Sequence, residues 1–151
     1  MEAVTRPWGN YTVLYENDNY KIKKIIVNPK SRLSLQSHKH RSEHWTIVKG
    51  YAIIQLGKDK LNLTANQHAF IPKETIHRIE NNSESIVELI EVQIGDYLGE
   101  DDIVRYEDDY SRNWLINENK KLIKIKCEEF DKYDRLLESL YTDTILAKKV
   151  T

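Results

Sequence analysis

Five side chains of the kinds that bind divalent metals fall within nine consecutive positions. Three imidazoles, one amide and one carboxylate form a set that zinc and other first-row divalent ions accept through nitrogen and oxygen. They are Gln36, His38, His40, Glu43 and His44. A surface loop has no general reason to collect these residue types, so the segment predicts a metal site.

Strand geometry indicates which of these side chains can meet. Successive side chains of a β-strand point to opposite faces, so Gln36, His38 and potentially His40 share one face. A turn at Arg41-Ser42 would then place Glu43 on a returning strand, in which the following side chains point alternately to the two faces. A second segment, which follows Pro72, contributes one more imidazole at position 77.

These segments belong to a long series of predicted strands. Short β-branched and aromatic runs, separated by turn residues every eight to twelve positions, are typical of an antiparallel sandwich or barrel. We therefore predict an all-β jelly roll, whose mouth can hold a ligand. The predicted strands are Tyr11–Tyr15, Tyr20–Val27, Leu33–His38, Glu43–Val48, Tyr51–Leu56, Lys60–Leu63, His68–Ile71, His77–Asn81 and Ile86–Ile94.

The end of the chain has a different pattern. Between Phe130 and Tyr141, apolar residues recur at steps of three and four among charged residues, which predicts an amphipathic helix. Its apolar face would pack on the sandwich or on a second subunit. We divide the chain into a domain at 1–112 and a helical extension at 113–151.

Composition limits the classes of partner. The chain has 151 residues, a net charge of −1, one cysteine and no apolar run of membrane-spanning length. Nothing here favours nucleic acid or anionic membrane as a partner, and a lone cysteine suits a reducing compartment. We expect a cytoplasmic protein, and the exposed strand edges and added helix make a homodimer the expected assembly.

The spacing of the two segments resembles the paired motifs of the cupin superfamily. The register Gln36-x-His38-x4-Glu43-x6-Gly50 fits the first motif, and Pro72-x4-His77-x3-Asn81 fits the second. This resemblance implies that Gln36, His38, Glu43 and His77 bind one divalent metal ion. Glycines that are usual in these motifs are replaced here by Lys30, Asn66 and Glu74.

Longer strings narrow the resemblance to the cupin domain of the type II mannose-6-phosphate isomerases. They are Arg6-Pro7-Trp8-Gly9, the string Gln-x-His-x-His-Arg-x-Glu-His-Trp at 36–45, and Tyr97-Leu98-Gly99-Glu100-Asp101-Asp102-Ile103-Val104-Arg105. The resemblance covers residues 4 to 112. It implies metal-dependent conversion between mannose 6-phosphate and fructose 6-phosphate, with zinc as the first candidate and manganese, cobalt, nickel or iron as alternatives. No Gly-rich nucleotide-binding loop precedes Arg6, so nucleotidyl transfer is not expected.

This isomerisation suggests further roles. The ordinary pKa of histidine is close enough to neutral pH for this side chain to move the C2 proton. His40 is the preferred base because the His44 side chain should face away from Glu43. The alternative is that His40 replaces Gln36 in the metal shell. Arg41 and Arg78 are candidates for the phosphate, since guanidinium can bind it through two hydrogen bonds. Trp45 could line the pocket or pack in the core.

Two other functions fit the same pattern. A metal-containing cupin could bind a sugar or sugar phosphate without converting it, in regulation or in a larger assembly. Another cupin chemistry, such as sugar epimerisation or oxygenation, is a further alternative, although the glutamine argues mildly against an oxygenase. A coupled assay with mannose 6-phosphate, with and without chelator, would separate these hypotheses.

Overall fold

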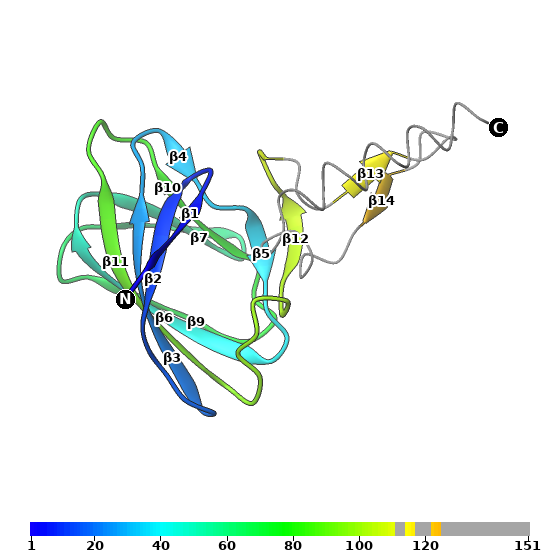
Figure 1. Cartoon of the computed structure of the whole chain (residues 1–151). Coiled ribbons are helices and arrows are strands. Elements are labelled where there is room, and N and C mark those ends of the chain that lie inside the picture. Colours follow the sequence, from blue (N-terminus) through cyan, green and yellow to red (C-terminus); the bar gives the residue numbers. More distant parts are fainter. Residues whose placement is uncertain (111–113, 117–121, 125–151) are drawn as a thin grey trace.

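The computed structural model describes residues 1–110, 114–116 and 122–124 of the chain, and every regular element in them is a β-strand. Two antiparallel sheets curve around a shared interior, with β5 and β12 side by side (Figure 1). The prediction of an all-β sandwich or barrel is therefore confirmed for the described part of the chain.

The first sheet has the strand order β1-β2-β3-β11-β6-β9. Its strands are β1 (Ala3–Arg6), β2 (Gly9–Glu16), β3 (Tyr20–Val27), β11 (Val87–Gly95), β6 (Arg41–Lys49) and β9 (His68–Ile71). The second sheet has the order β12-β5-β10-β7-β8, and β4 also pairs with β10. Its strands are β12 (Val104–Glu107), β5 (Leu35–Ser37), β10 (His77–Asn81), β7 (Ala52–Leu56), β8 (Asp59–Leu63) and β4 (Ser31–Arg32).

Strand β6 shows how the sequence pattern positions functional groups. Its inward positions Arg41, Glu43, Trp45 and Ile47 are all buried, whereas the residues between them are partly or fully exposed. Ile47 continues into the apolar core, while Arg41 and Glu43 bring charges to the other end of the same face. One strand thus joins the core of the sandwich to its functional end.

Strand β10 is buried on both faces. All five of its residues are buried, and the strand pairs with β4, β5 and β7. In the β5–β10 register His77 lies opposite Gln36. This pairing brings the second predicted motif next to the first.

Three residues other than glycine have left-handed backbone conformations. They are Lys30 (φ 56°), Asn66 (φ 73°) and Glu74 (φ 64°), the same positions at which the cupin motifs usually have glycine. The backbone has thus kept a turn geometry that favours glycine although the side chain has changed. The Glu74 turn is also tied to the functional end, because its N–H donates to the carbonyl of His38 at 2.7 Å.

Several boundaries differ from the predictions. Strands β1, β4 and β12 were not predicted, and the strand predicted at 33–38 is shortened to β5 at 35–37. Within the predicted helical extension, the structure describes two short antiparallel strands, β13 (Trp114–Ile116) and β14 (Leu122–Lys124). The helix predicted at 130–141 lies outside the described residues. In the described part of the chain, no helix is long and apolar enough to cross a membrane.

Candidate metal centre and substrate cavity

Three buried side chains converge where the two sheets meet. His38 follows β5, Glu43 lies on β6 and His77 begins β10. One ligand atom from each side chain lies within 4.8 Å of the other two. The structure therefore brings together three of the four residues that the cupin resemblance assigned to the metal.

The tautomers of the two histidines are set by backbone carbonyls. His38 Nδ1 lies 2.6 Å from the carbonyl oxygen of Asp102, and His77 Nδ1 lies 2.7 Å from that of Thr75. A carbonyl only accepts, so both Nδ1 atoms carry the proton and both Nε2 atoms present a lone pair. Those Nε2 atoms lie 3.2 Å and 3.5 Å from the Glu43 carboxylate. Fixing a metal-binding imidazole through its second nitrogen is common in metal sites.

The charge states also suit a metal. Burial, together with Arg41 and His77, outweighs the attraction of Glu43 and lowers the pKa of His38 to about 4. Burial alone would raise the pKa of Glu43, but His38 and Arg41 hold it well below its usual value. At neutral pH the group thus contains a neutral imidazole and a carboxylate, which are ligand forms. His77 Nε2 is buried and has no hydrogen-bond partner in the described part of the structure, as expected of an atom reserved for a metal.

Gln36 lies beside this group. Its Oε1 accepts a hydrogen bond from Ser34 Oγ at 2.9 Å, and its side chain lines the neighbouring cavity. The role of Gln36 as a fourth ligand therefore stays a prediction.

His40 lies away from the group. The β5–β6 turn falls at Lys39 and His40, and Arg41 is already in the strand, so Arg41 and not His40 takes the inward position before Glu43. The His40 side chain is 44% exposed, with Nδ1 3.8 Å from Asp96, and it is not part of the cavity lining. This location does not support either predicted role of His40, as base or as metal ligand.

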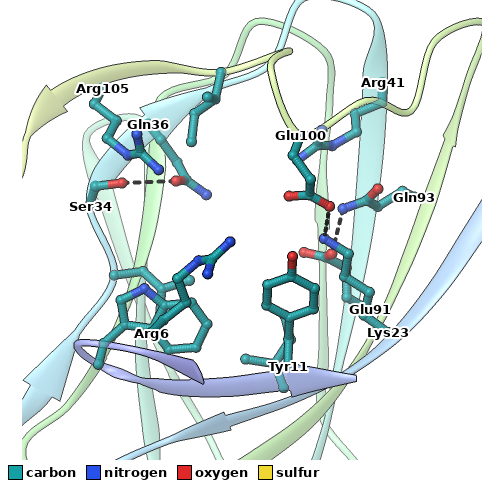
Figure 2. A pocket seen from close by; sticks show the side chains of 14 residues that line it. Arg6, Tyr11, Lys23, Ser34, Gln36, Arg41, Glu91, Gln93, Glu100 and Arg105 are labelled. Carbon is teal, nitrogen blue, oxygen red and sulfur yellow. Dashed lines mark hydrogen bonds and ion pairs between the residues drawn. The ribbon is translucent and has the colours of Figure 1, made fainter. Parts of the chain in front are cut away.

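The cavity beside the metal group has two unlike walls (Figure 2). One wall presents the guanidinium groups of Arg6 and Arg105 together with the amide of Gln36. The facing wall presents Lys23, Glu91, Glu100 and the hydroxyl of Tyr11. A cationic wall suits a phosphate group, and a mixed wall of carboxylates and donors suits hydroxyl groups.

Glu91 has the titration behaviour of an acid–base group. It is buried, its Oε2 accepts from Trp45 Nε1 at 2.9 Å, and its Oε1 accepts from Gln93 Nε2 at 2.6 Å. Burial and the nearby Glu43 carboxylate raise the pKa of Glu91 to about 7, although Lys23 opposes the increase. A carboxyl group with a pKa near neutrality can both accept and return a proton.

Arg41 joins the cavity to the metal group. Its Nε donates to Glu43 Oε1 at 2.9 Å, its Nη1 donates to the carbonyl of Gly99 at 3.3 Å, and its Nη2 lies 3.4 Å from His38 Nε2. Arg41 therefore lines the cavity, but its guanidinium group is already bonded to Glu43 and to a loop carbonyl. This position fits the orientation of Glu43 better than the predicted role as phosphate clamp.

Two predicted contacts with substrate are not supported. Trp45 is fully buried, and its Nε1 donates to both Glu43 and Glu91, so it positions carboxylates and does not line the cavity. Arg78 is also buried and donates to the carbonyl oxygens of Leu33 and Glu107. Arg78 follows His77 in β10 and points to the opposite face of the strand, where it links β10 to Glu107 of β12.

Comparison with known proteins shows the family to which the chain belongs. A family model described as Mannose-6-phosphate isomerase C-terminal matches residues 1–108. The chain belongs to this family. The xanthan biosynthesis protein XanB of Xanthomonas campestris is 50% identical over 109 residues, which are 72% of this chain and 23% of that protein. A mannose-1-phosphate guanylyltransferase of Salmonella muenchen is 44% identical over 104 residues, or 69% and 22%.

The chain thus spans less than a quarter of the length of these curated relatives. Solved structures agree with the fold. A double-stranded β-helix protein of Klebsiella pneumoniae matches with a TM-score of 0.60 at 17% identity, over 69% of this chain and 89% of that one. A cupin described as a sugar phosphate isomerase, from Silicibacter pomeroyi, matches with a TM-score of 0.53 at 13% identity, over 58% and 59%. These neighbours show that this member of the mannose-6-phosphate isomerase C-terminal family has a cupin fold.

Five charged residues of the cavity were not among the site candidates drawn from the sequence. They are Arg6, Lys23, Glu91, Glu100 and Arg105. The alternation of β3 carried one available signal, since Lys21 and Lys23 occupy the inward positions that continue to Ile25 and Val27. Charged residues on an inward face indicate either a site or a buried ion pair.

Proposed function

We propose that the chain isomerises a sugar phosphate, with mannose 6-phosphate and fructose 6-phosphate as the first candidate pair. The observation that carries the proposal is a buried His-Glu-His group in ligand form beside a cavity with one cationic wall. Membership in the mannose-6-phosphate isomerase family supports the same substrate class.

His38, Glu43 and His77 would hold a divalent ion, with zinc the first candidate and Gln36 the proposed fourth ligand. When bound, such an ion would supply a Lewis acid for the two adjacent oxygens of an aldose or ketose. Arg41 would keep Glu43 ionised and in place, because its Nε bonds the same carboxylate.

The cationic wall would bind the phosphate. Arg6 and Arg105 reach the cavity from β1 and β12, two strands of different sheets, and their guanidinium groups both turn toward it (Figure 2). Two such groups can bind one phosphate through paired hydrogen bonds. The reacting carbons would then lie toward the facing wall.

Glu91 would move the proton between C2 and C1. It lines the cavity, Trp45 and Gln93 fix its two oxygens, and its pKa of about 7 suits transfer in both directions. Its buried position beside the metal group makes it a better candidate than the exposed His40.

The test is a coupled assay of mannose 6-phosphate conversion by the metal-loaded full chain, with a chelator-treated sample as control. We expect conversion that chelator abolishes and metal restores, and entry of solvent deuterium at C1 or C2 of the sugar. Glu91→Gln should lower kcat by about a hundredfold or more while metal content stays the same, since a proton carrier contributes about 10²–10⁴-fold. Tight binding of the sugar phosphate without conversion would contradict the isomerase and favour a binding protein.

A further inference from the structure

The loop between β11 and β12, residues 96–103, brings a carboxylate into the cavity. Buried side chains hold its first part: Lys21 Nζ donates to the carbonyl of Leu98 at 2.8 Å, and Arg41 donates to that of Gly99. The next residue, Glu100, pairs with the buried Lys23 through Oε1. The loop is therefore fixed at the point where Glu100 enters the cavity.

The same loop also holds the metal group. The Asp102 carbonyl accepts from His38 Nδ1, and the Asp102 carboxylate accepts from the N–H groups of Lys39 and His40 at 2.9 Å each. A ligand that contacts Glu100 would thus bind two residues along the chain from Asp102, whose carbonyl orients His38.

Glu100 has an oxygen directed toward the cavity. While Oε1 bonds Lys23, the other oxygen turns toward the open centre, opposite the wall formed by Arg6, Arg105 and Gln36 (Figure 2). The side chain is 36% exposed, in contrast to Glu91, which is 5% exposed and has a partner on each oxygen. Burial would raise the pKa of Glu100, but Lys23 and Arg41 lower it to about 2, so the group is an acceptor at neutral pH.

We propose that Glu100 recognises the sugar: its carboxylate accepts hydrogen bonds from hydroxyl groups of a sugar phosphate whose phosphate lies against Arg6 and Arg105. The inference rests on the proposed substrate class and assigns the part of the site that selects the sugar. A phosphate alone would gain nothing from this carboxylate, since both are anionic. An acceptor that a bound sugar covers is left without a partner when the sugar lacks the matching hydroxyl group, so such an analogue should bind more weakly.

The test measures binding to the metal-loaded full chain by calorimetry, with inorganic phosphate and fructose 6-phosphate as separate probes. In Glu100→Gln we expect unchanged or stronger binding of inorganic phosphate and about tenfold or more weaker binding of fructose 6-phosphate, the usual effect of losing a hydrogen bond to a charged group. The matched control is Glu84→Gln. Glu84 is 86% exposed and pairs with Lys30, which is distant from it in the sequence. This substitution should change neither affinity.

The different responses of the two probes separate recognition of the sugar from simple charge balance. If Glu100 serves only as a counterion for Lys23, Glu100→Gln should strengthen both probes or leave both unchanged, and either result would overturn the proposal. Mono-deoxy analogues of the sugar phosphate, tested on the unaltered chain, give an answer even if the variant folds poorly. At least one should bind about tenfold more weakly than the parent sugar, and equal binding by all of them would also overturn it.

Failure of the isomerase proposal would look different. Binding of fructose 6-phosphate without conversion would remove the isomerase while leaving the role of Glu100 to be judged from the same titrations. Absence of sugar phosphate binding in the unaltered chain would remove both.

Discussion

The histidines that point into the site (the inner histidines) and those that point away from it (the outer histidines) differ in whether a backbone carbonyl holds the second ring nitrogen. His38 and His77 are buried, and each donates from Nδ1 to a backbone carbonyl, which leaves Nε2 facing Glu43. His40, His44 and His68 are exposed or partly exposed; His44 stacks on Phe70 with ring centroids 4.7 Å apart. The same side chain is therefore a ligand candidate only where the backbone fixes its tautomer and strand alternation turns it inward.

The largest expected effect is the loss of metal binding, which should follow substitution of an inner histidine but not of an outer one. His77→Ala or His38→Ala should abolish stoichiometric metal binding, because each removes one of three converging ligand atoms. His44→Ala should keep the metal content of the unaltered chain, as it alters only the outer face of β6. Elemental analysis after reconstitution and dialysis measures both. Full metal retention in the double variant of His38 and His77 would remove the metal centre from this position.

A smaller effect is expected when the support of an inner histidine is weakened. Asp102→Ala removes the carboxylate that accepts from the N–H groups of Lys39 and His40, next to His38. We expect metal affinity to fall by about 10- to 100-fold, as is typical when groups that support a ligand are lost. Competition with a chromophoric chelator measures it.

The neighbouring Asp101→Ala is the control for this experiment. Asp101 accepts from the Tyr97 hydroxyl on the exposed side of the loop, so its loss should leave metal affinity near that of the unaltered chain. Equal losses in the two variants would mean that the loop acts only as a whole and that Asp102 has no particular role.

The charged residues beside the inner histidines should make stability depend on pH. Because the folded-state pKa of Glu91 is raised from 4.5 to about 7, the folded chain binds this proton more tightly than the unfolded chain. The resulting stabilisation is complete below pH 4.5 and is lost as the pH rises through about 7.

Glu91→Gln should therefore leave Tm nearly unchanged at pH 5 and raise it by about 2–5 °C at pH 8 in metal-free protein. Thermal unfolding followed by circular dichroism measures the difference. Glu88→Gln, on the outer face of the same strand, should show no such dependence on pH. A variant of Glu91 that loses stability at pH 8 would contradict the raised pKa.

The smallest effect is expected at the outer histidine nearest the site. His40→Gln should change kcat and metal content by less than about twofold, because surface substitutions away from packed or paired groups have small effects. Steady-state kinetics on the metal-loaded chain measures it. A tenfold fall in kcat with metal retained would restore His40 as the base and would weaken the distinction between the two sets.

Local pattern predicted much of the fold and the centre of the site. Alternation predicted eight of the strands nearly at their observed bounds, and the paired motifs predicted the meeting of His38, Glu43 and His77. The turn was placed too late by about two residues, because short polar segments such as Lys39-His40 and Arg41-Ser42 fit a turn equally well. That shift exchanged the inward and outward positions of His40 and Arg41.

The walls of the cavity could not be predicted in the same way. Arg6, Lys23, Glu100 and Arg105 come from β1, β3, a loop and β12, and only the order of strands in the two sheets brings them together. Long-range pairing of this kind leaves no spacing signal in the sequence. The left-handed turns at Lys30, Asn66 and Glu74 are an intermediate case, since their glycine-like geometry is visible only through the resemblance to the family motifs.

Because β10 is buried on both faces and paired on both edges, the chain segments that hold the two inner histidines should differ in how often they open to solvent. The amide of a residue such as His77 should exchange its hydrogen with solvent only when most of the sandwich unfolds. The loop at 96–103 belongs to no strand and is held by hydrogen bonds to a few side chains, so it should open more often than β10. A bound ion would then leave through the His38 side of the centre, at a rate set by loop opening and not by global unfolding. The lifetime of the metal would thus be controlled by the same segment that carries Glu100 into the cavity.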